Sequence, residues 1–333
     1  MKNKKILILG GAGFIGHNLA IFLNDLGAKI TIVDGLQVNN LISVLSNEDK
    51  LPFPEIAKKI LLERINLIQK NKINFIIQDV RDYHGLSKIF NKVKPDVVIH
   101  LAAVSHSNRS NKNPFNTFDH SLRTLENALD NARNYNEIHF IYFSSSMVYG
   151  NFTKKNVSEE DSCKPLGIYG ALKYSGEKIV EAYSQVFGLK YTIIRPSALY
   201  GERCISRRVG QIFIENCLNH KSLEISGDGE EMLDFTNIKD LAEGVAKVIL
   251  SKQSINQTFN LTFGKARKIN ELILILNDYF PKIKTKYIKK DRLMPERGTL
   301  SINKAKKLLG YKPKWDLEKG YRSYIEWYKK FIK

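Results

Sequence analysis

Cysteine is scarce in this chain of 333 residues, which contains only Cys163, Cys204 and Cys217. The number is odd and no Cys-x-x-Cys pair occurs, so the sequence predicts neither a disulfide framework nor a zinc site, and we expect no bound metal. Free cysteines of this kind are typical of the reducing cytoplasm, which is the compartment that we expect for this protein.

Long hydrophobic runs are also missing. No stretch reaches the roughly 18 apolar residues needed to cross a bilayer, so no membrane span is predicted. Three lysines precede the apolar residues 6–9 and imitate the start of a secretory signal, but glycines interrupt the run from Gly10 onwards. We therefore interpret Lys5–Leu9 as a first strand.

Acidic residues are too few to balance the basic ones. The chain has 52 Lys and Arg against 34 Asp and Glu, a net charge of +18, and residues 265–333 hold 20 basic against 7 acidic residues. Such a charge favours acidic partners, including phosphorylated substrates, membrane surfaces and nucleic acid. No zinc-finger spacing, arginine-rich block or aromatic RNA-binding motif accompanies it, so no specific nucleic-acid partner is predicted.

Short apolar segments alternate with helical patterns over the first 195 residues, which implies crossover connections and a parallel sheet. A helix is expected from Phe14 to about Leu26, where Gly27 ends it. The expected strands are Lys5–Leu9, Lys29–Val33, Asn74–Gln78, Asp96–His100, His139–Phe143 and Tyr191–Ile194, with further candidates at Leu223–Ile225 and Thr258–Leu261 and a closing helix at Leu317–Phe331.

The length is that of about two domains. We predict an α/β protein with a doubly wound parallel (Rossmann) sheet and a smaller C-terminal α/β substrate lobe. The nucleotide-binding domain would comprise residues 1–195, with 236–262 returning to it, and the lobe residues 196–235 and 263–333. Residues 35–71 predict a loop and an extra helix with Ile56, Ile60, Ile65 and Ile68 at helical spacing, and either a lid, a dimer contact or a packed insertion fits this pattern.

A glycine-rich turn, Gly10-Gly11-Ala12-Gly13-Phe14-Ile15-Gly16, joins the first strand to the first helix. Glycine there permits a tight turn and a close approach of phosphate to the helix N-terminus. Asp34 ends the second strand, where a carboxylate accepts hydrogen bonds from an adenosine ribose and repels an added 2′-phosphate. Because Gly35-Leu36-Gln37 supplies no compensating cation, the sequence predicts NAD rather than NADP.

Tyr169 and Lys173 are four residues apart on an expected helix, so their side chains share one face. A phenol has a pKa of about 10, and a cation near 4 Å lowers it by roughly one to three units, depending on the effective dielectric. Tyr169 is therefore a candidate base near neutral pH.

These motifs occur together with others in one order along nearly the whole chain. The sequence resembles the extended short-chain dehydrogenases/reductases, in particular the NAD-dependent nucleotide-sugar epimerase/dehydratase family. The further motifs that carry the resemblance are Asp79-Val80, His100-Leu101-Ala102-Ala103, Val148-Tyr149-Gly150, Arg195-Pro196, Gly227-Asp228-Gly229, Asp234-Phe235 and Leu309-Gly310-Tyr311.

The resemblance implies roles for individual residues. Tyr169 would remove a hydroxyl proton while hydride leaves the same carbon, Lys173 would also hold the nicotinamide ribose, and Ser145 would bond the reacting oxygen. The resemblance also implies a homodimer. The residues expected to bind the cofactor are Gly10, Gly13, Phe14, Ile15, Gly16, Asp34, Asp79, Val80, Leu101, Ala102, Ala103, Tyr169 and Lys173, and those expected to bind substrate are Ser105, Ser145, Ser146, Arg207, Arg208 and Arg297.

Several positions depart from the family's pattern. Relatives that eliminate water or decarboxylate carry acidic residues after the catalytic Ser or Thr, whereas this chain has Ser146-Met147. Ala198 stands where many relatives have Asn, Leu233 where many have a phosphate-binding Arg, and Gly167 where many have Ser. We therefore predict that the three arginines named above hold the diphosphate.

Three hypotheses follow. The first is an NAD-dependent nucleotide-sugar epimerase, acting at C4 through a transient keto sugar, with a 4-oxidase, ketoreductase or dehydratase of the same family as the alternative. The second is a dehydrogenase of small non-sugar alcohols. The third is a non-catalytic, NAD-sensing protein that binds nucleic acid through its basic C-terminal region, against which the complete Ser-Tyr-Lys set argues.

Overall fold

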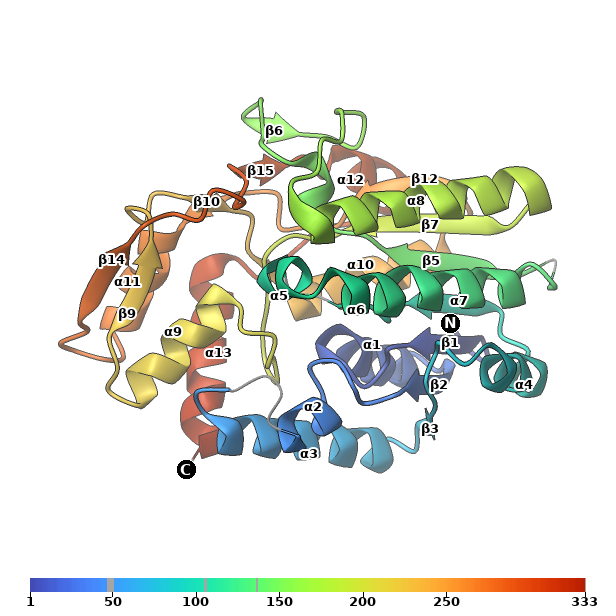
Figure 1. Cartoon of the computed structure of the whole chain (residues 1–333), viewed down its shortest axis with the longest axis horizontal. Helices are drawn as coiled ribbons and strands as arrows, with labels where there is room; N and C mark the ends of the chain where they lie inside the picture. The colour runs from blue at the N-terminus through green and yellow to red at the C-terminus, as the bar shows by residue number, and fades with distance from the viewer. Residues whose placement is uncertain (47–50, 105–106, 136, 333) are drawn as a thin grey trace.

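A seven-stranded parallel sheet forms the centre of the computed structural model, which describes residues 1–46, 51–104, 107–135 and 137–332 (Figure 1). The strands lie in the order β12-β7-β5-β4-β1-β2-β3, and every neighbouring pair is parallel. Their bounds are β1 Lys5–Leu9, β2 Lys29–Asp34, β3 Asn74–Ile77, β4 Val97–His100, β5 His139–Phe143, β7 Lys190–Arg195 and β12 Gln257–Asn260.

Helices cover both faces of this sheet because alternate strand side chains point to opposite sides. In β1, Ile6 and Ile8 join one buried cluster and Leu7 and Leu9 the other. Helices α1 (Phe14–Asp25) and α10 (Ile238–Leu250) pack together on the first face, with α3 (Pro54–Lys70) against α1. Helices α4 (Tyr83–Val93), α7 (Thr124–Ala132) and α8 (Gly167–Phe187) cover the second. The predicted doubly wound α/β fold is confirmed.

The predicted strands agree with the observed ones to within one residue at each end. The first helix is one residue shorter than predicted, and Leu26, which follows it, is 44% exposed. Gly27 has φ +86°, so the chain leaves the helix just before it. The closing helix, α13, spans Leu317–Ile332.

The 35–71 segment contains two helices, α2 (Leu41–Leu45) and α3, instead of the one predicted. Ile60 and Ile68 of α3 are buried in the core that includes α1. This part of the segment is packed into the molecule.

Short sheets and helices beyond residue 196 build a second region at one side of the central sheet (Figure 1). Strand β12 follows α10 and pairs with β7, so the chain returns to the central sheet before residues 263–333. The remaining elements are α5 (Ser107–Lys112), α6 (Pro114–Phe118), η1 (Asp119–Arg123), η2 (Ser146–Tyr149), η3 (Lys252–Ser254), α9 (Val209–Leu218), α11 (Ile269–Asn277), α12 (Asn303–Leu309) and the paired strands β6 (Asn156–Val157) with β15 (Thr299–Leu300), β8 (Leu199–Tyr200) with β11 (Thr236–Asn237), β9 (Leu223–Ser226) with β14 (Thr285–Ile288), and β10 (Met232–Leu233) with β13 (Arg267–Lys268).

The sheet order reverses between β1 and β4, which lie side by side although β2 and β3 separate them in the chain. In open α/β sheets a crevice forms at such a point, outside the carboxyl ends of the strands, and ligands bind in it. Across the described residues, none of the helices has the length and apolar character needed to cross a membrane.

Candidate active site

A groove lies at the carboxyl ends of β1, β2 and β4, where the topology predicts a ligand. Eleven of the thirteen residues predicted to bind the cofactor line it, and Tyr169 and Lys173 line the cavity next to it. The eleven are Gly10, Gly13, Phe14, Ile15, Gly16, Asp34, Asp79, Val80, Leu101, Ala102 and Ala103.

The glycine-rich turn fits a dinucleotide. A Cβ on Gly10 would lie 2.7 Å from the Ala102 nitrogen, and one on Gly16 would lie 2.5 Å from the Gly11 Cα, so both positions require glycine. Helix α1 begins at Phe14 with no side-chain cap and no acidic residue in its first turn. Its N-terminal N–H groups and the positive end of its dipole therefore remain for an anion such as a pyrophosphate.

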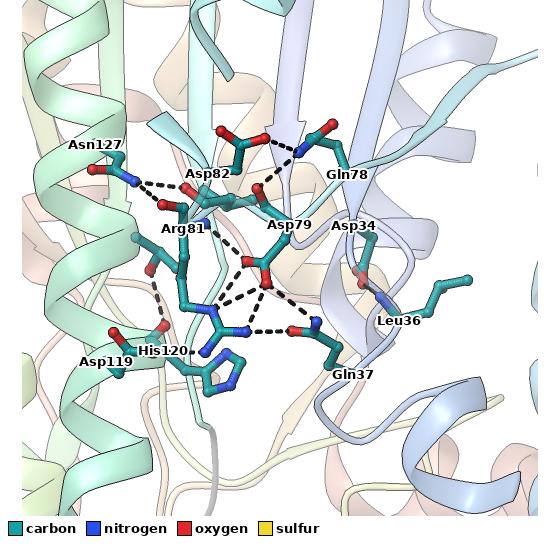
Figure 2. Close-up of polar contacts among 12 residues, drawn as sticks. Asp34, Leu36, Gln37, Gln78, Asp79, Arg81, Asp82, Asp119, His120 and Asn127 are labelled. Atoms are coloured by element: carbon teal, nitrogen blue, oxygen red, sulfur yellow. Dashed lines mark hydrogen bonds and ion pairs between the residues drawn. The ribbon is translucent and has the colours of Figure 1, made fainter. Parts of the chain in front are cut away.

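Asp34 is fixed at the end of β2 by the backbone. Its carboxylate accepts hydrogen bonds from Ala12 N at 3.0 Å and from Leu36 N at 2.7 Å, and Figure 2 shows the second of these. Burial raises the pKa of Asp34, whereas these two N–H groups and the charge of Arg64 oppose the rise. The carboxylate thus stands in the groove where a ribose hydroxyl of a dinucleotide would donate to it.

A second polar cluster, which the sequence analysis did not identify, encloses Asp79 (Figure 2). Arg81 Nη2 donates to Asp79 Oδ2 at 2.7 Å and to Gln37 Oε1 at 3.2 Å, while its Nη1 donates to Asp119 at 2.6 Å. Gln37 Nε2 in turn donates to Asp79 at 3.1 Å. An arginine does therefore lie near the groove, but two carboxylates already neutralise it. One indication of this cluster was present in the sequence, because Arg81 follows Asp79 by only two residues and could therefore pair with it.

The three predicted catalytic side chains line one cavity of about 540 Å³, a size typical of small-molecule sites. Ser145 precedes η2 and its Oγ accepts a hydrogen bond from Met147 N at 3.2 Å. Tyr169 and Lys173 come from the first turns of α8. The cavity joins the groove, because Ile15, Leu101, Ala103, Leu199 and Arg208 line both.

Lys173 is 7% exposed, and its Nζ donates to the Phe143 carbonyl at 2.7 Å and lies 5.2 Å from the centre of the Tyr142 ring. Burial lowers the pKa of Lys173 to about 8, although the charge of Glu177 opposes this. Glu177 follows Lys173 by one helical turn and is fully buried.

Glu177 also joins two other buried residues, Ser144 and Arg195. It forms a buried ion pair with Arg195, whose Nε and Nη2 donate at 2.9 and 2.6 Å, and it accepts a hydrogen bond from Ser144, the neighbour of Ser145. The turn with Ser145 and the helix with Tyr169 and Lys173 thus share one buried carboxylate.

The predicted substrate residues Ser145, Ser146, Arg207, Arg208 and Arg297 all line the cavity. Ser105 lies outside the described residues. Ala198 and Leu233, where the resemblance implies Asn and Arg, also line the cavity and leave those parts of its wall apolar.

Behind the glycine-rich turn lies a buried cation that the sequence analysis missed. Arg64, from α3, is 1% exposed and donates to the Ala12 carbonyl at 3.4 Å and, through Nε, to the Arg203 carbonyl at 3.0 Å. Arg203 Nε lies 3.2 Å from His17 Nε2, and His17 Nδ1 lies 2.8 Å from the Gly13 carbonyl. Burial, reinforced by the charges of Arg64 and Arg203, lowers the pKa of His17 well below its ordinary value, so the ring is neutral and donates to Gly13.

A doubly wound sheet with this turn, an acidic residue after β2 and a Ser-Tyr-Lys cavity beside the groove defines a class of dinucleotide-dependent enzymes that act between alcohol and carbonyl. A family model described as the NAD dependent epimerase/dehydratase family matches residues 6–262, and the chain belongs to that family.

Known proteins resemble the chain over almost its whole length. A putative UDP-glucose 4-epimerase of Methanocaldococcus jannaschii is 32% identical over 334 residues, which cover 97% of this chain and 98% of the relative. YtcB of Bacillus subtilis, an uncharacterized UDP-glucose epimerase, is 30% identical over 325 residues and 96% of each chain. The UDP-glucuronic acid 4-epimerase of Bacillus cereus, solved with UDP-glucuronic acid and NAD, superimposes with a TM-score of 0.86 at 26% identity over 99% of each chain.

These comparisons confirm the predicted family, an enzyme of the sugar-nucleotide epimerase/oxidoreductase type, and NAD as its cofactor.

Proposed function

We propose that this protein is an NAD-dependent nucleotide-sugar 4-epimerase that works through a transient keto sugar. The observation that carries the proposal is the cavity lined by Ser145, Tyr169 and Lys173, which opens into the dinucleotide groove and has arginines elsewhere in its wall. The relatives and the solved neighbour named above support the substrate class and the carbon.

Each side chain has a task in this scheme. Tyr169 takes the proton of the C4 hydroxyl and later returns it, and Ser145 donates its hydroxyl hydrogen to the reacting oxygen. Lys173, held by the Phe143 carbonyl, supplies a positive charge in the same cavity, one helical turn from Tyr169. When bound, NAD accepts hydride from C4 and gives it back. The epimer results when the keto sugar turns its other face before the carbon is reduced.

The cofactor assignments remain part of the proposal. Asp34 accepts ribose hydroxyls, Asp79 and Val80 lie at the adenine end, and the N-terminus of α1 holds the pyrophosphate. Arg207, Arg208 and Arg297 hold the substrate's diphosphate, with Ser146 and Ser105 near the sugar.

The wall of the cavity favours epimerisation over water elimination. Ser145 is followed by Ser146 and Met147, both of which line the cavity, so no carboxylate stands at this point to move the proton that elimination requires. A 4-oxidase or ketoreductase would use the same three catalytic residues without the turn of the sugar, and is the alternative.

The test is incubation of the purified protein and NAD with UDP-, dTDP-, GDP- and CDP-sugars, followed by NMR of the products. We expect a C4 epimer of one of them at unchanged mass. A product with two hydrogens fewer or more would show net oxidation or reduction, and the absence of any converted nucleotide sugar would contradict the proposal.

We also propose the two-domain division at residues 1–195 with 236–262 and at 196–235 with 263–333, a cytoplasmic location and a homodimer. The return of β12 to the central sheet supports the division, and the three free cysteines support a reducing compartment. Phe115 and Phe118 of α6, which are 85% and 57% exposed, offer an apolar surface for a second copy. Light scattering after size-exclusion chromatography would test the dimer.

A further inference from the structure

A carboxylate with too few partners lies among the cations of the cavity. One oxygen of Glu231 is 3.6 Å from Lys290 Nζ, and the other is buried and, within the described part of the chain, has no hydrogen-bond partner. Nε of Arg208 is also buried and has no hydrogen-bond partner among the described residues. Glu231 and Arg208 both line the cavity, together with Arg297. Burial and the charge of Arg208 lower the pKa of Arg297 to about 10, whereas Glu231 opposes this, so the three groups lie within electrostatic reach of one another.

The absence of a side chain at Gly227 leaves room for the Glu231 carboxylate. A Cβ on Gly227 would lie 2.2 Å from Glu231 Oε1, and Gly227 has φ +76°, which favours glycine. The side chain therefore occupies the space that a larger residue at position 227 would fill, and it is held beside the turn at the end of β9.

Glu231 lies where the cavity adjoins a second hollow that the catalytic side chains do not line. Glu231, Lys290 and Arg297 line this hollow of about 280 Å³, whereas Ser145, Tyr169 and Lys173 do not. With the sugar at Tyr169 and the diphosphate at the arginines, the nucleoside is the part of the substrate that reaches Glu231.

We infer that Glu231 accepts hydrogen bonds from the ribose hydroxyls of the substrate's nucleoside, so that the enzyme selects ribonucleoside over 2′-deoxyribonucleoside diphosphate sugars. An ionised carboxylate only accepts hydrogen bonds, and a vicinal diol offers it two donors, as the adenosine ribose offers Asp34. The ligand would provide the partner that the free oxygen lacks. The inference rests on the proposed function, because it takes the cavity to hold a nucleotide sugar.

The experiment compares UDP with 2′-deoxy-UDP by calorimetry on the NAD-loaded protein, its Glu231→Ala and Glu231→Gln variants, and Glu230→Ala as the matched control. Glu230 is the preceding residue, and its carboxylate is already paired with Lys268 at 2.5 Å and Asn270 at 2.9 Å. A hydrogen bond to a charged group corresponds to a preference of about 10- to 150-fold. We expect the parent and the Glu230 variant to prefer UDP by a factor in this range.

In Glu231→Ala the preference should disappear because UDP binds more weakly, while 2′-deoxy-UDP binds no more weakly than before and so shows that the site is intact. Glu231→Gln, which keeps the shape of the side chain, should lose most of the preference. Equal binding of the two nucleotides by the parent, or a preference that survives both substitutions, would overturn the inference while leaving the proposed function in place. A parent that binds neither UDP nor any nucleotide sugar would instead overturn the proposed function. GDP binding that alone depends on Glu231 would assign the carboxylate to the base and not to the ribose.

Discussion

Replacing Lys173 by Met should abolish turnover and, at the same time, remove the cost in folding free energy of burying the lysine charge. The Lys173 ammonium is buried against the Phe143 carbonyl and the Tyr142 ring, and burial lowers its pKa from 10.5 to about 8. Because the folded state binds this proton less tightly than the unfolded state does, the charged lysine destabilises the fold at neutral pH. Met fills similar volume without the charge, so it removes this penalty and also the positive charge one helical turn from Tyr169.

The size of the effect follows from the two pKa values. Below pH 8 the full penalty of Lys173 applies, and above pH 10.5 it vanishes, so the parent gains stability as the pH rises between them. A shift from 10.5 to about 8 makes the free energy of unfolding of the parent rise by about 2 kcal/mol relative to Lys173→Met between pH 7 and pH 9.5. The Phe143 carbonyl loses its donor in the variant at both pH values, so that cost leaves the comparison unchanged.

Urea unfolding of both proteins, without ligands, at pH 7 and pH 9.5 measures this change. Ionisation of the other lysines is common to parent and variant and cancels. A difference in the free energy of unfolding that is the same at both pH values would refute the reasoning, because it would mean that Lys173 has an ordinary pKa in the folded protein. The variant should also show no turnover of the nucleotide sugar and weaker NAD binding.

The remaining predictions concern the ligands. Tyr169→Phe should keep its fold and its affinity for NAD but lose turnover, and near-normal rates with the identified substrate would contradict the proposed base. Asp34→Ala should weaken NAD binding and reduce the preference for NAD over NADP, which fluorescence titration measures; a parent that binds NADP as tightly as NAD would disprove the assignment. No product should be lighter than its substrate by one water, and mass spectrometry would reveal such a loss. Replacing Arg207, Arg208 or Arg297 singly by Ala should weaken UDP binding by about 10- to 150-fold and affect NAD affinity much less. If all three variants bind UDP as tightly as the parent, the diphosphate is bound elsewhere.

The sequence predicted the parts of the site that depend on local pattern. The glycine-rich turn follows β1 and Asp34 is the last residue of β2, and the carboxyl ends of such strands meet at one edge of the sheet. Tyr169 and Lys173 share a face because they are one helical turn apart. Local pattern was enough in these cases, because neighbouring parallel strands bring the first two features together and one helical turn joins the last two residues.

Contacts across long stretches of chain could not be predicted in the same way. Arg81 meets Asp119, and Glu177 meets Ser144 and Arg195, only after the sheet has formed. A single sequence shows that Glu177 and Arg195 are charged, but a charged residue is most often exposed, so composition argued against the burial of these two. Of the three alternatives for the 35–71 segment, the burial of Ile60 and Ile68 agrees with the packed insertion.

The burial of Arg64 could, however, have been predicted from the sequence. Arg64 follows Ile60 by four residues and precedes Ile68 by four, which places it in the buried stripe of α3 between two core isoleucines. A guanidinium in such a stripe must find acceptors, because a buried cation without them costs several kcal/mol. The carbonyls of Ala12 and Arg203 serve as those acceptors, and they belong to the glycine-rich turn and to the loop that leads to Arg207 and Arg208. One buried side chain of α3 therefore connects the glycine-rich turn of the groove to the loop that leads to the arginines proposed to hold the diphosphate, so the 35–71 segment helps to support the candidate site.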